Sequence, residues 1–103
     1  MLNRRKRRPT HPGELLREDI LPAARLTQAE LALRIGVSRR TINEIVHERR
    51  PVTTDMAHRL GRAFRTTPEF WLNLQQSVDL WDAMQENRKE YERIMPMLSG
   101  KVA

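Results

Sequence analysis

Apolar residues recur at intervals of three and four positions along most of the chain, and the polar turns between these segments are short. No stretch shows the strict alternation of apolar and polar residues that marks a half-buried strand. The pattern therefore predicts an all-α fold, and its breaks divide the chain into five helices.

The first helix is predicted to open at Pro12 and Gly13 and to end where Pro22 interrupts the pattern. A fourth helix follows a polar loop and begins after a cap at Thr53 or Thr54. The inward-facing residues expected on these two helices are Leu15, Leu16, Ile20 and Leu21 on the first, and Met56, Ala57, Leu60 and Phe64 on the fourth.

The second and third helices are predicted from their caps. The second starts at "TQAE", where Thr27 and Glu30 have the spacing of a capping box, and it stops at Gly36, which suits a tight turn. Ser38 caps the third helix. The buried residues expected here are Leu31, Ala32 and Ile35, then Ile42, Ile45 and Val46.

The fifth helix follows the cap candidate Thr67 and begins at Pro68, with Pro96 as the outer limit of its end. It carries more apolar residues than one face of a small core needs, so we expect part of it to contact a partner, most simply a second copy of the chain. One stripe runs along it through Phe70, Leu74, Val78, Trp81 and Met84. We assign Phe70 and Leu74 to the core. The predicted dimer interface consists of Leu74, Val78, Trp81 and Met84, so Leu74 belongs to both sets.

Two short helices joined by a tight turn form a helix-turn-helix, whose second helix enters the major groove of DNA. With the apolar face buried, the polar residues of the third helix must point outward. Arginine pairs with guanine through two bonds and glutamate accepts from cytosine, so we expect guanine-containing half-sites. The predicted base-reading residues are Arg39, Arg40, Asn43 and Glu44, and the predicted backbone contacts are Gln28, Ser38, Thr41, Arg49 and Arg50.

The distribution of charge supports a polyanionic partner. The net charge is +6 over 103 residues, with one basic zone at residues 1–8 and another at residues 34–65, whereas residues 66–92 are acidic. The first zone is either a solvated tail or an arm that binds nucleic acid. We therefore divide the chain into a basic tail (1–10), a helix-turn-helix domain (11–66), a C-terminal dimerisation helix (67–95) and a second tail (96–103).

Three stretches together resemble the HigA-type antitoxins, the HigA/VapI branch of the lambda-repressor-like helix-turn-helix proteins. They are "HPGELLREDIL", "TQAELALRIGVSRRTINEIVHERRPVTTDMAHRLGRAF" and "TTPEFWLNLQQSVDLW". The resemblance implies a five-helix domain with a long C-terminal helix, and a dimer that represses its own operon at a palindromic operator. It also implies a protein partner, a HigB-type toxin that cleaves mRNA. The N-terminal "NRRKRR" and the charged extension after Trp81 depart from the family's pattern.

Other classes of protein fit less well. The three histidines and the acids show no metal-ligand spacing and cysteine is absent, so we expect no enzyme, no metal and no cofactor. No apolar run is long enough to span a membrane and no signal core follows the basic start, which predicts a cytoplasmic protein. A stand-alone repressor without a toxin remains the alternative. The acidic segment 79–92 and the basic tail are the two candidates for a toxin-facing surface, and the alternative for each is a solvated surface.

Overall fold

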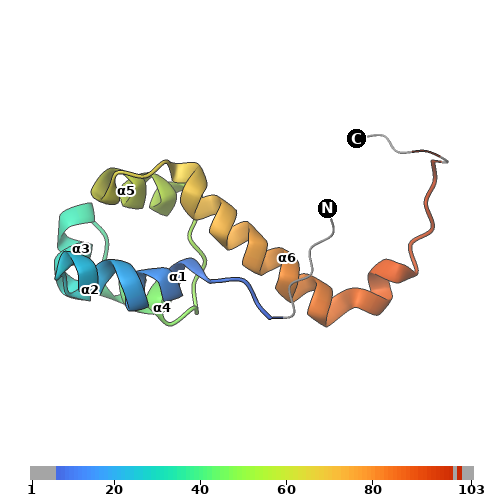
Figure 1. Cartoon of the computed structure of the whole chain (residues 1–103), viewed down its shortest axis with the longest axis horizontal. Helices are drawn as coiled ribbons and strands as arrows, with labels where there is room; N and C mark the ends of the chain where they lie inside the picture. Colours follow the sequence, from blue (N-terminus) through green and yellow to red (C-terminus); the bar gives the residue numbers. More distant parts are fainter. Residues whose placement is uncertain (1–6, 99, 101–103) are drawn as a thin grey trace.

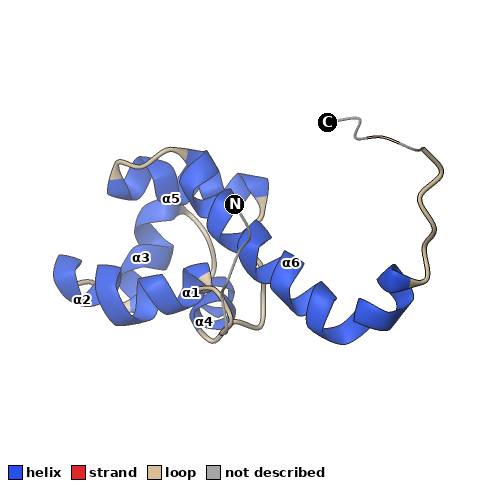
Figure 2. Cartoon of the chain, turned by 45° about the vertical axis from the view of Figure 1, so that its right-hand side comes forward, coloured by secondary structure: helices blue, strands red, loops and turns tan. Residues whose placement is uncertain are grey.

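The computed structural model describes residues 7–98 and residue 100. Figures 1 and 2 show a helical domain from which one long helix projects, and the described residues contain no strand. The elements are α1 (Pro12–Leu15), η1 (Leu16–Ile20), α2 (Leu21–Ala24), α3 (Gln28–Ile35), α4 (Arg39–Val46), α5 (Thr54–Phe64) and α6 (Pro68–Glu92). Because α1, η1 and α2 form one unbroken helix, the predicted all-α fold of five helices is confirmed.

The first helix continues beyond Pro22, because a π-helical segment, η1, comes just before this proline. The amide of Leu21 donates to the carbonyl of Leu16, five residues earlier. In a regular α-helix a proline ring collides with the carbonyl four residues earlier, and the wider π turn relieves that contact. The helix continues to Ala24 and ends at Arg25, whose φ is 55°. The prediction that it ends at Pro22 is therefore wrong.

The caps of α3 and α4 are those that the sequence predicts. Thr27 Oγ1 accepts from the amide of Glu30 at 3.1 Å, and the Glu30 carboxylate accepts from the amide of Thr27 at 2.9 Å. Ser38 Oγ accepts from the amide of Thr41 at 3.1 Å. Between the two helices Gly36 has a φ of 75°, a left-handed conformation that favours glycine. The tight turn fixes α4 directly after α3.

The core draws buried apolar residues from all five helices. Thr53 is the cap of α5, since its hydroxyl accepts from the amide of Met56 at 3.3 Å. Of the residues predicted to face inward on the first four helices, Leu15, Ile20, Ile35 and Phe64 are only partly buried at the margin. The buried cluster consists of Leu16, Leu21, Leu31, Ala32, Ile42, Ile45, Val46, Val52, Met56, Ala57, Leu60 and Trp71.

Two polar contacts determine which face of α6 meets the domain. Trp71 Nε1 donates to Thr66 Oγ1 at 2.7 Å, and Gln75 Oε1 accepts from the amide of Val52 at 2.9 Å. The buried residues of α6 are Trp71, Gln75 and Val78. Phe70 is 40% exposed and packs edge-on against Trp71, so its assignment to the core is wrong. The inner face is rotated toward Trp71, while Leu74 packs at the margin of the core as expected.

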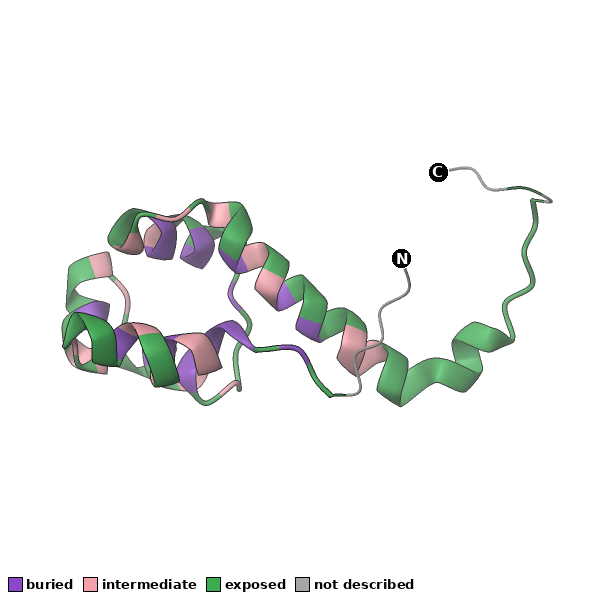
Figure 3. Cartoon of the chain, in the orientation of Figure 1, coloured by how far each residue is buried: buried purple, intermediate pink, exposed green. Residues whose placement is uncertain are grey.

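The outer part of α6 leaves the domain. Every described residue from Met84 onward is exposed, as the continuous green of Figure 3 shows. Asn87 has non-helical dihedral angles, φ −126° and ψ 20°, and marks a kink in the helix. The helix ends at Glu92, inside the limit that Pro96 sets.

The start of the first helix is capped by a buried histidine. His11 is 3% exposed, and its Nδ1 accepts from the amide of Gly13 at 2.8 Å. An accepting Nδ1 requires a neutral ring with its proton on Nε2. Burial lowers the pKa of His11, and the charge of Arg8 lowers it further against the opposing effect of Glu48.

This cap predicts a loss of stability in mild acid. The unfolded chain takes up a proton near pH 6.5, whereas folded His11 resists it, so the free energy of unfolding falls as the pH drops below about 6.5, by up to about 1.4 kcal/mol per unit. Asparagine caps helices without titrating in this range, so His11→Asn removes this component. Urea unfolding between pH 7.5 and 5.5 measures it, with His58→Asn at an exposed histidine as control. Equal slopes for His11→Asn and wild type contradict the assignment.

Candidate nucleic-acid interface

The outward face of α4 carries the residues predicted to read bases. Arg39, Arg40 and Asn43 are exposed and Glu44 is half-buried, while Ile42, Ile45 and Val46 are fully buried. Arg40 has 83% of its side chain exposed. The amphipathic packing of α4 therefore presents this polar set to solvent, in the first two turns of the helix.

Glu44 lies between two arginines of the predicted interface. Arg40 Nε donates to Glu44 Oε2 at 3.2 Å, and Arg50 donates to Glu44 Oε1 from Nη2 at 2.6 Å and from Nε at 2.9 Å. The hydrogen bonds from Arg50 and then Arg40 hold the pKa of Glu44 below its usual range. The carboxylate stays ionised and draws Arg40 and Arg50 toward one point on the surface.

Asn43 and Gln28 are also paired. Asn43 Nδ2 donates to Gln28 Oε1 at 3.2 Å, which joins the outward face of α4 to the first residue of α3. Asn43 is exposed and Gln28 half-buried. A predicted base contact and a predicted phosphate contact therefore lie side by side at the start of α3, where amides that point out of a helix suit a phosphate.

The remaining predicted backbone contacts flank α4. Ser38 and Thr41 share a hydrogen bond of 2.9 Å between their hydroxyls at the N-terminal end of the helix. Arg49 is exposed in the loop after α4 and forms no ion pair with the residues that the structure describes. The structure thus brings the predicted residues to one side of the domain, around both ends of α4.

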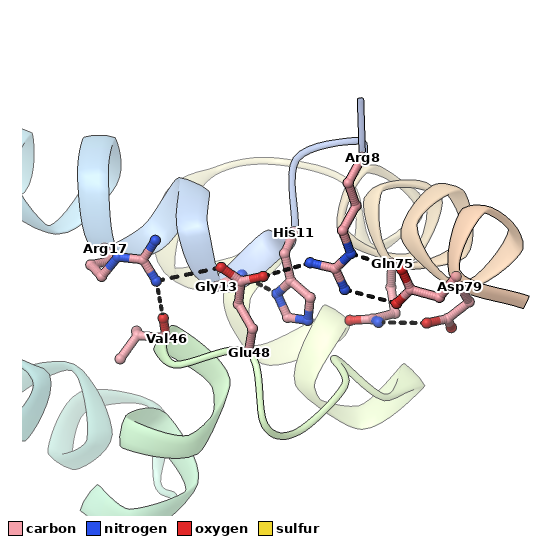
Figure 4. Close-up of polar contacts among 9 residues, drawn as sticks. Arg8, His11, Gly13, Arg17, Val46, Glu48, Gln75 and Asp79 are labelled. Carbon is pink, nitrogen blue, oxygen red and sulfur yellow. Dashed lines mark hydrogen bonds and ion pairs between the residues drawn. The ribbon is translucent and has the colours of Figure 1, made fainter. Parts of the chain in front are cut away.

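Glu48 and Arg17 hold the C-terminal end of α4, and the sequence analysis assigned them no role. Arg17 Nη1 donates to the carbonyl of Val46 and lies 3.7 Å from the Glu48 carboxylate (Figure 4). Glu48 has a left-handed φ of 61° and follows α4 by two residues. An arginine beside the last carbonyls of a helix is a familiar end signal, but only the fold brings Arg17 there.

The basic N-terminal zone belongs partly to the folded domain. Residues 1–6, with Arg4, Arg5 and Lys6, lie outside the described residues. Arg8 forms ion pairs with Glu48 and Asp82, and Pro9 and His11 are buried. Arg8 and Pro9, which the sequence places in the predicted tail (1–10), therefore contact the domain. The opposite charges of residues 1–8 and 66–92 were the available signal for this contact.

The predicted dimer residues differ in exposure. Met84 is 39% exposed and Trp81 is half-buried, so both retain surface for a partner. Leu74 packs against the core, and Val78 is 1% exposed within its own chain. Val78 therefore has no surface left to offer a second copy, which corrects its place in the predicted interface.

Within residues 7–98 and 100, no helix combines the length and the apolar character needed to cross a bilayer.

α3 and α4, the glycine turn between them and the exposed arginine face of α4 define a helix-turn-helix domain of the DNA-binding kind.

Comparison with known proteins gives the same class of domain, a DNA-binding helix-turn-helix. The sequence pattern of the helix-turn-helix family matches residues 16–71. Antitoxin HigA-1 of Vibrio cholerae is 35% identical over 96 residues, which cover 93% of this chain and 90% of that protein. The solved structure of Pseudomonas aeruginosa antitoxin HigA with the higBA promoter matches with a TM-score of 0.83 and 44% identity, over 88% of this chain and 100% of that one. Antitoxin GraA in complex with its operator gives 0.84 and 40%, over 95% and 100%.

The chain belongs to the helix-turn-helix family, in its HigA-type antitoxin branch. This membership confirms the resemblance found in the sequence. It also confirms that the chain is a DNA-binding protein of the antitoxin and repressor kind and not an enzyme.

Proposed function

We propose that this chain is the antitoxin of a type II toxin–antitoxin system, acting in the cytoplasm. It neutralises a HigB-type, mRNA-cleaving toxin and, as a homodimer, represses its own operon at a palindromic operator. The observation that carries the DNA-binding part is the exposed arginine face of α4, presented by a capped helix-turn-helix. Relatives with the same fold have been solved with a promoter or an operator, which supports this part of the proposal.

In this proposal Arg39, Arg40, Asn43 and Glu44 read bases, and Gln28, Ser38, Thr41, Arg49 and Arg50 contact the backbone. Arg40 is the residue we assign to guanine, because its guanidinium is exposed and, among the residues that the structure describes, pairs only with Glu44. Glu44 also holds Arg50, so it orients one base-reading and one phosphate-binding arginine together. Arg40 bonds Oε2 of Glu44 and Arg50 bonds Oε1, so Glu44 would bind cytosine through an oxygen that already accepts from one of these arginines.

The dimer contact runs along α6 through Trp81 and Met84, with Leu74 at its inner end. Two copies joined there place their α4 helices one helical turn of DNA apart, about 34 Å, so that one dimer covers one palindrome.

Arg40 and Arg49 provide a matched test of base reading. Arg40→Ala should weaken binding to the preferred operator by about 1–3 kcal/mol and relax preference at one base pair. Arg49→Ala should weaken all sequences alike and lower the salt slope by about one. Fluorescence anisotropy on operator and scrambled DNA, at several salt concentrations, separates the two. An equal loss on both DNAs for Arg40→Ala removes it from base reading.

The dimer assignment is tested at Trp81. A carboxylate in an apolar contact is costly, so Trp81→Asp and Met84→Asp should be monomeric in sedimentation equilibrium at concentrations where the wild type is a dimer. Leu33→Asp is the matched control, because Leu33 is 83% exposed on α3, away from the proposed contact. If Trp81→Asp and Met84→Asp both stay dimeric, the contact lies elsewhere.

The toxin separates this proposal from its alternative, a stand-alone helix-turn-helix repressor. We expect the tagged chain, expressed with its neighbouring open reading frames, to retain a small basic protein through purification. The mass of the co-purifying protein and the relief of its toxicity by this chain are the readouts. Recovery of the chain alone, still able to shift its own promoter, favours the stand-alone repressor.

A further inference from the structure

Arg8 connects two elements that lie far apart in the sequence. Its Nε and Nη2 donate to the two carboxylate oxygens of Asp82 on α6, both at 2.8 Å. Its Nη1 donates to Glu48 Oε1 at 2.7 Å, and Figure 4 draws this contact. Such a two-bond pairing of arginine with carboxylate fixes direction as well as distance. Lysine, with a single ammonium, cannot reproduce both contacts in this planar arrangement.

One end of this bridge, Glu48, follows α4, the helix proposed to read bases. Glu48 lies two residues after α4, and its carboxylate also faces Arg17 at 3.7 Å. Arg17 in turn donates to the carbonyl of Val46, the last residue of α4. The position of Glu48 is therefore tied to the end of α4, and Arg8 holds α6 against that end.

On the other side, Asp82 lies where α6 leaves the domain. Gln75 anchors the helix to Val52 and donates to Asp79 at 3.0 Å, but among the described residues the bond from Arg8 to Asp82 is the last hydrogen-bonded contact between α6 and the rest of the domain. From Met84 onward every described residue is exposed (Figure 3). Asp82 lies seven positions beyond Gln75, about 10 Å along the helix, and past Val78, the last buried residue that the structure describes on α6. The contact with Arg8 is therefore the outermost one that bears on the direction in which the outer half projects.

A small change of that direction matters in a dimer joined through α6. With recognition helices about 34 Å apart, each lies roughly 17 Å from the two-fold axis, and a rotation of about 10° moves it by about 3 Å. That displacement is close to the rise of one base pair, about 3.4 Å. The angle between α6 and α4 therefore sets which spacing of half-sites the dimer fits.

We propose that Arg8, by bridging Asp82 and Glu48, is a positioning residue that sets the half-site spacing this protein selects. The inference rests on the proposed function, a dimer on a palindrome. Arg8 acts through the angle between α6 and α4 and reads no base itself.

Arg8→Gln is the test and Arg7→Gln its control. Both variants remove one positive charge at adjacent positions, and Arg7 is exposed and forms no ion pair with the described residues. Binding is measured on the selected operator, on operators with the centre shortened or lengthened by one base pair, and on a single half-site. Wild type and Arg7→Gln should bind the operator with native spacing about tenfold or more tightly than the altered operators. Arg8→Gln should reduce this ratio to about threefold or less. Its affinity for the single half-site should equal that of Arg7→Gln. An equal loss on every spacing leaves Arg8 with a charge or stability role only, and overturns the proposal.

A second measurement needs neither DNA nor a dimer. The chain has no cysteine, so spin labels can be attached at Arg39→Cys on α4 and Glu86→Cys on α6. The electron–electron distance between the two labels reports the angle between α4 and α6. Labelled chains are diluted in unlabelled ones so that only distances within one chain are measured. Arg8→Gln should broaden or shift the distance distribution, and Arg7→Gln should not. Should Arg8→Gln fail to fold, Asp82→Asn breaks the same bridge from α6 and must give the same result. If the folded variant gives the same distance distribution as the wild type, the positioning role is overturned. If the wild type prefers no spacing but Arg8→Gln still shifts the distance distribution, the palindrome is contradicted and the positioning role is kept.

Discussion

The start of the first helix packs so closely against the end of the recognition helix that only a glycine fits between them. A Cβ on Gly13 would lie 1.8 Å from the carbonyl oxygen of Ile45 and 2.8 Å from its carbon, far inside any van der Waals contact. His11 caps the helix at this point and Pro12 supplies its first residue. The stretch "HPG" thus forms a helix start with no side chain in the way. Since Ile45 lies in α4, this contact fixes how the exposed arginine face of α4 is presented.

The charged contacts around this junction have a different role from the core. Arg8, Arg17, Glu48 and Asp82 all keep between a quarter and two-fifths of their side chains exposed, and ion pairs at such exposure contribute only about 0.2–1 kcal/mol each. The buried cluster of aliphatic residues and Trp71 therefore supplies the stability. The ion pairs set directions instead, because they join the N-terminal segment, the end of α4 and the start of the projecting part of α6. Glu44 does the same for the arginines of the DNA-facing surface.

Features encoded by neighbouring residues could be predicted from the sequence, and those that depend on distant contacts could not. The caps at Thr27, Ser38 and Thr67 and the turn at Gly36 follow from local hydrogen bonding and backbone sterics. The exposed face of α4 follows from its apolar spacing. The inner face of α6 did not, because the hydrogen bond that holds Gln75 inward comes from Val52, 23 residues earlier in the chain. The bridge from Arg8 to Asp82 spans 74 residues, and the opposite charges of the two zones do not tell which residues pair.

In the proposed complex the two α4 helices of one dimer read one palindrome. Hydroxyl-radical footprinting of the DNA upstream of this chain's own gene tests this arrangement. Two protected blocks are expected on the same face of the duplex, with centres about 10 base pairs apart, appearing together as the protein concentration rises. A single protected block at saturation, or protection no different from that on unrelated DNA, would contradict it.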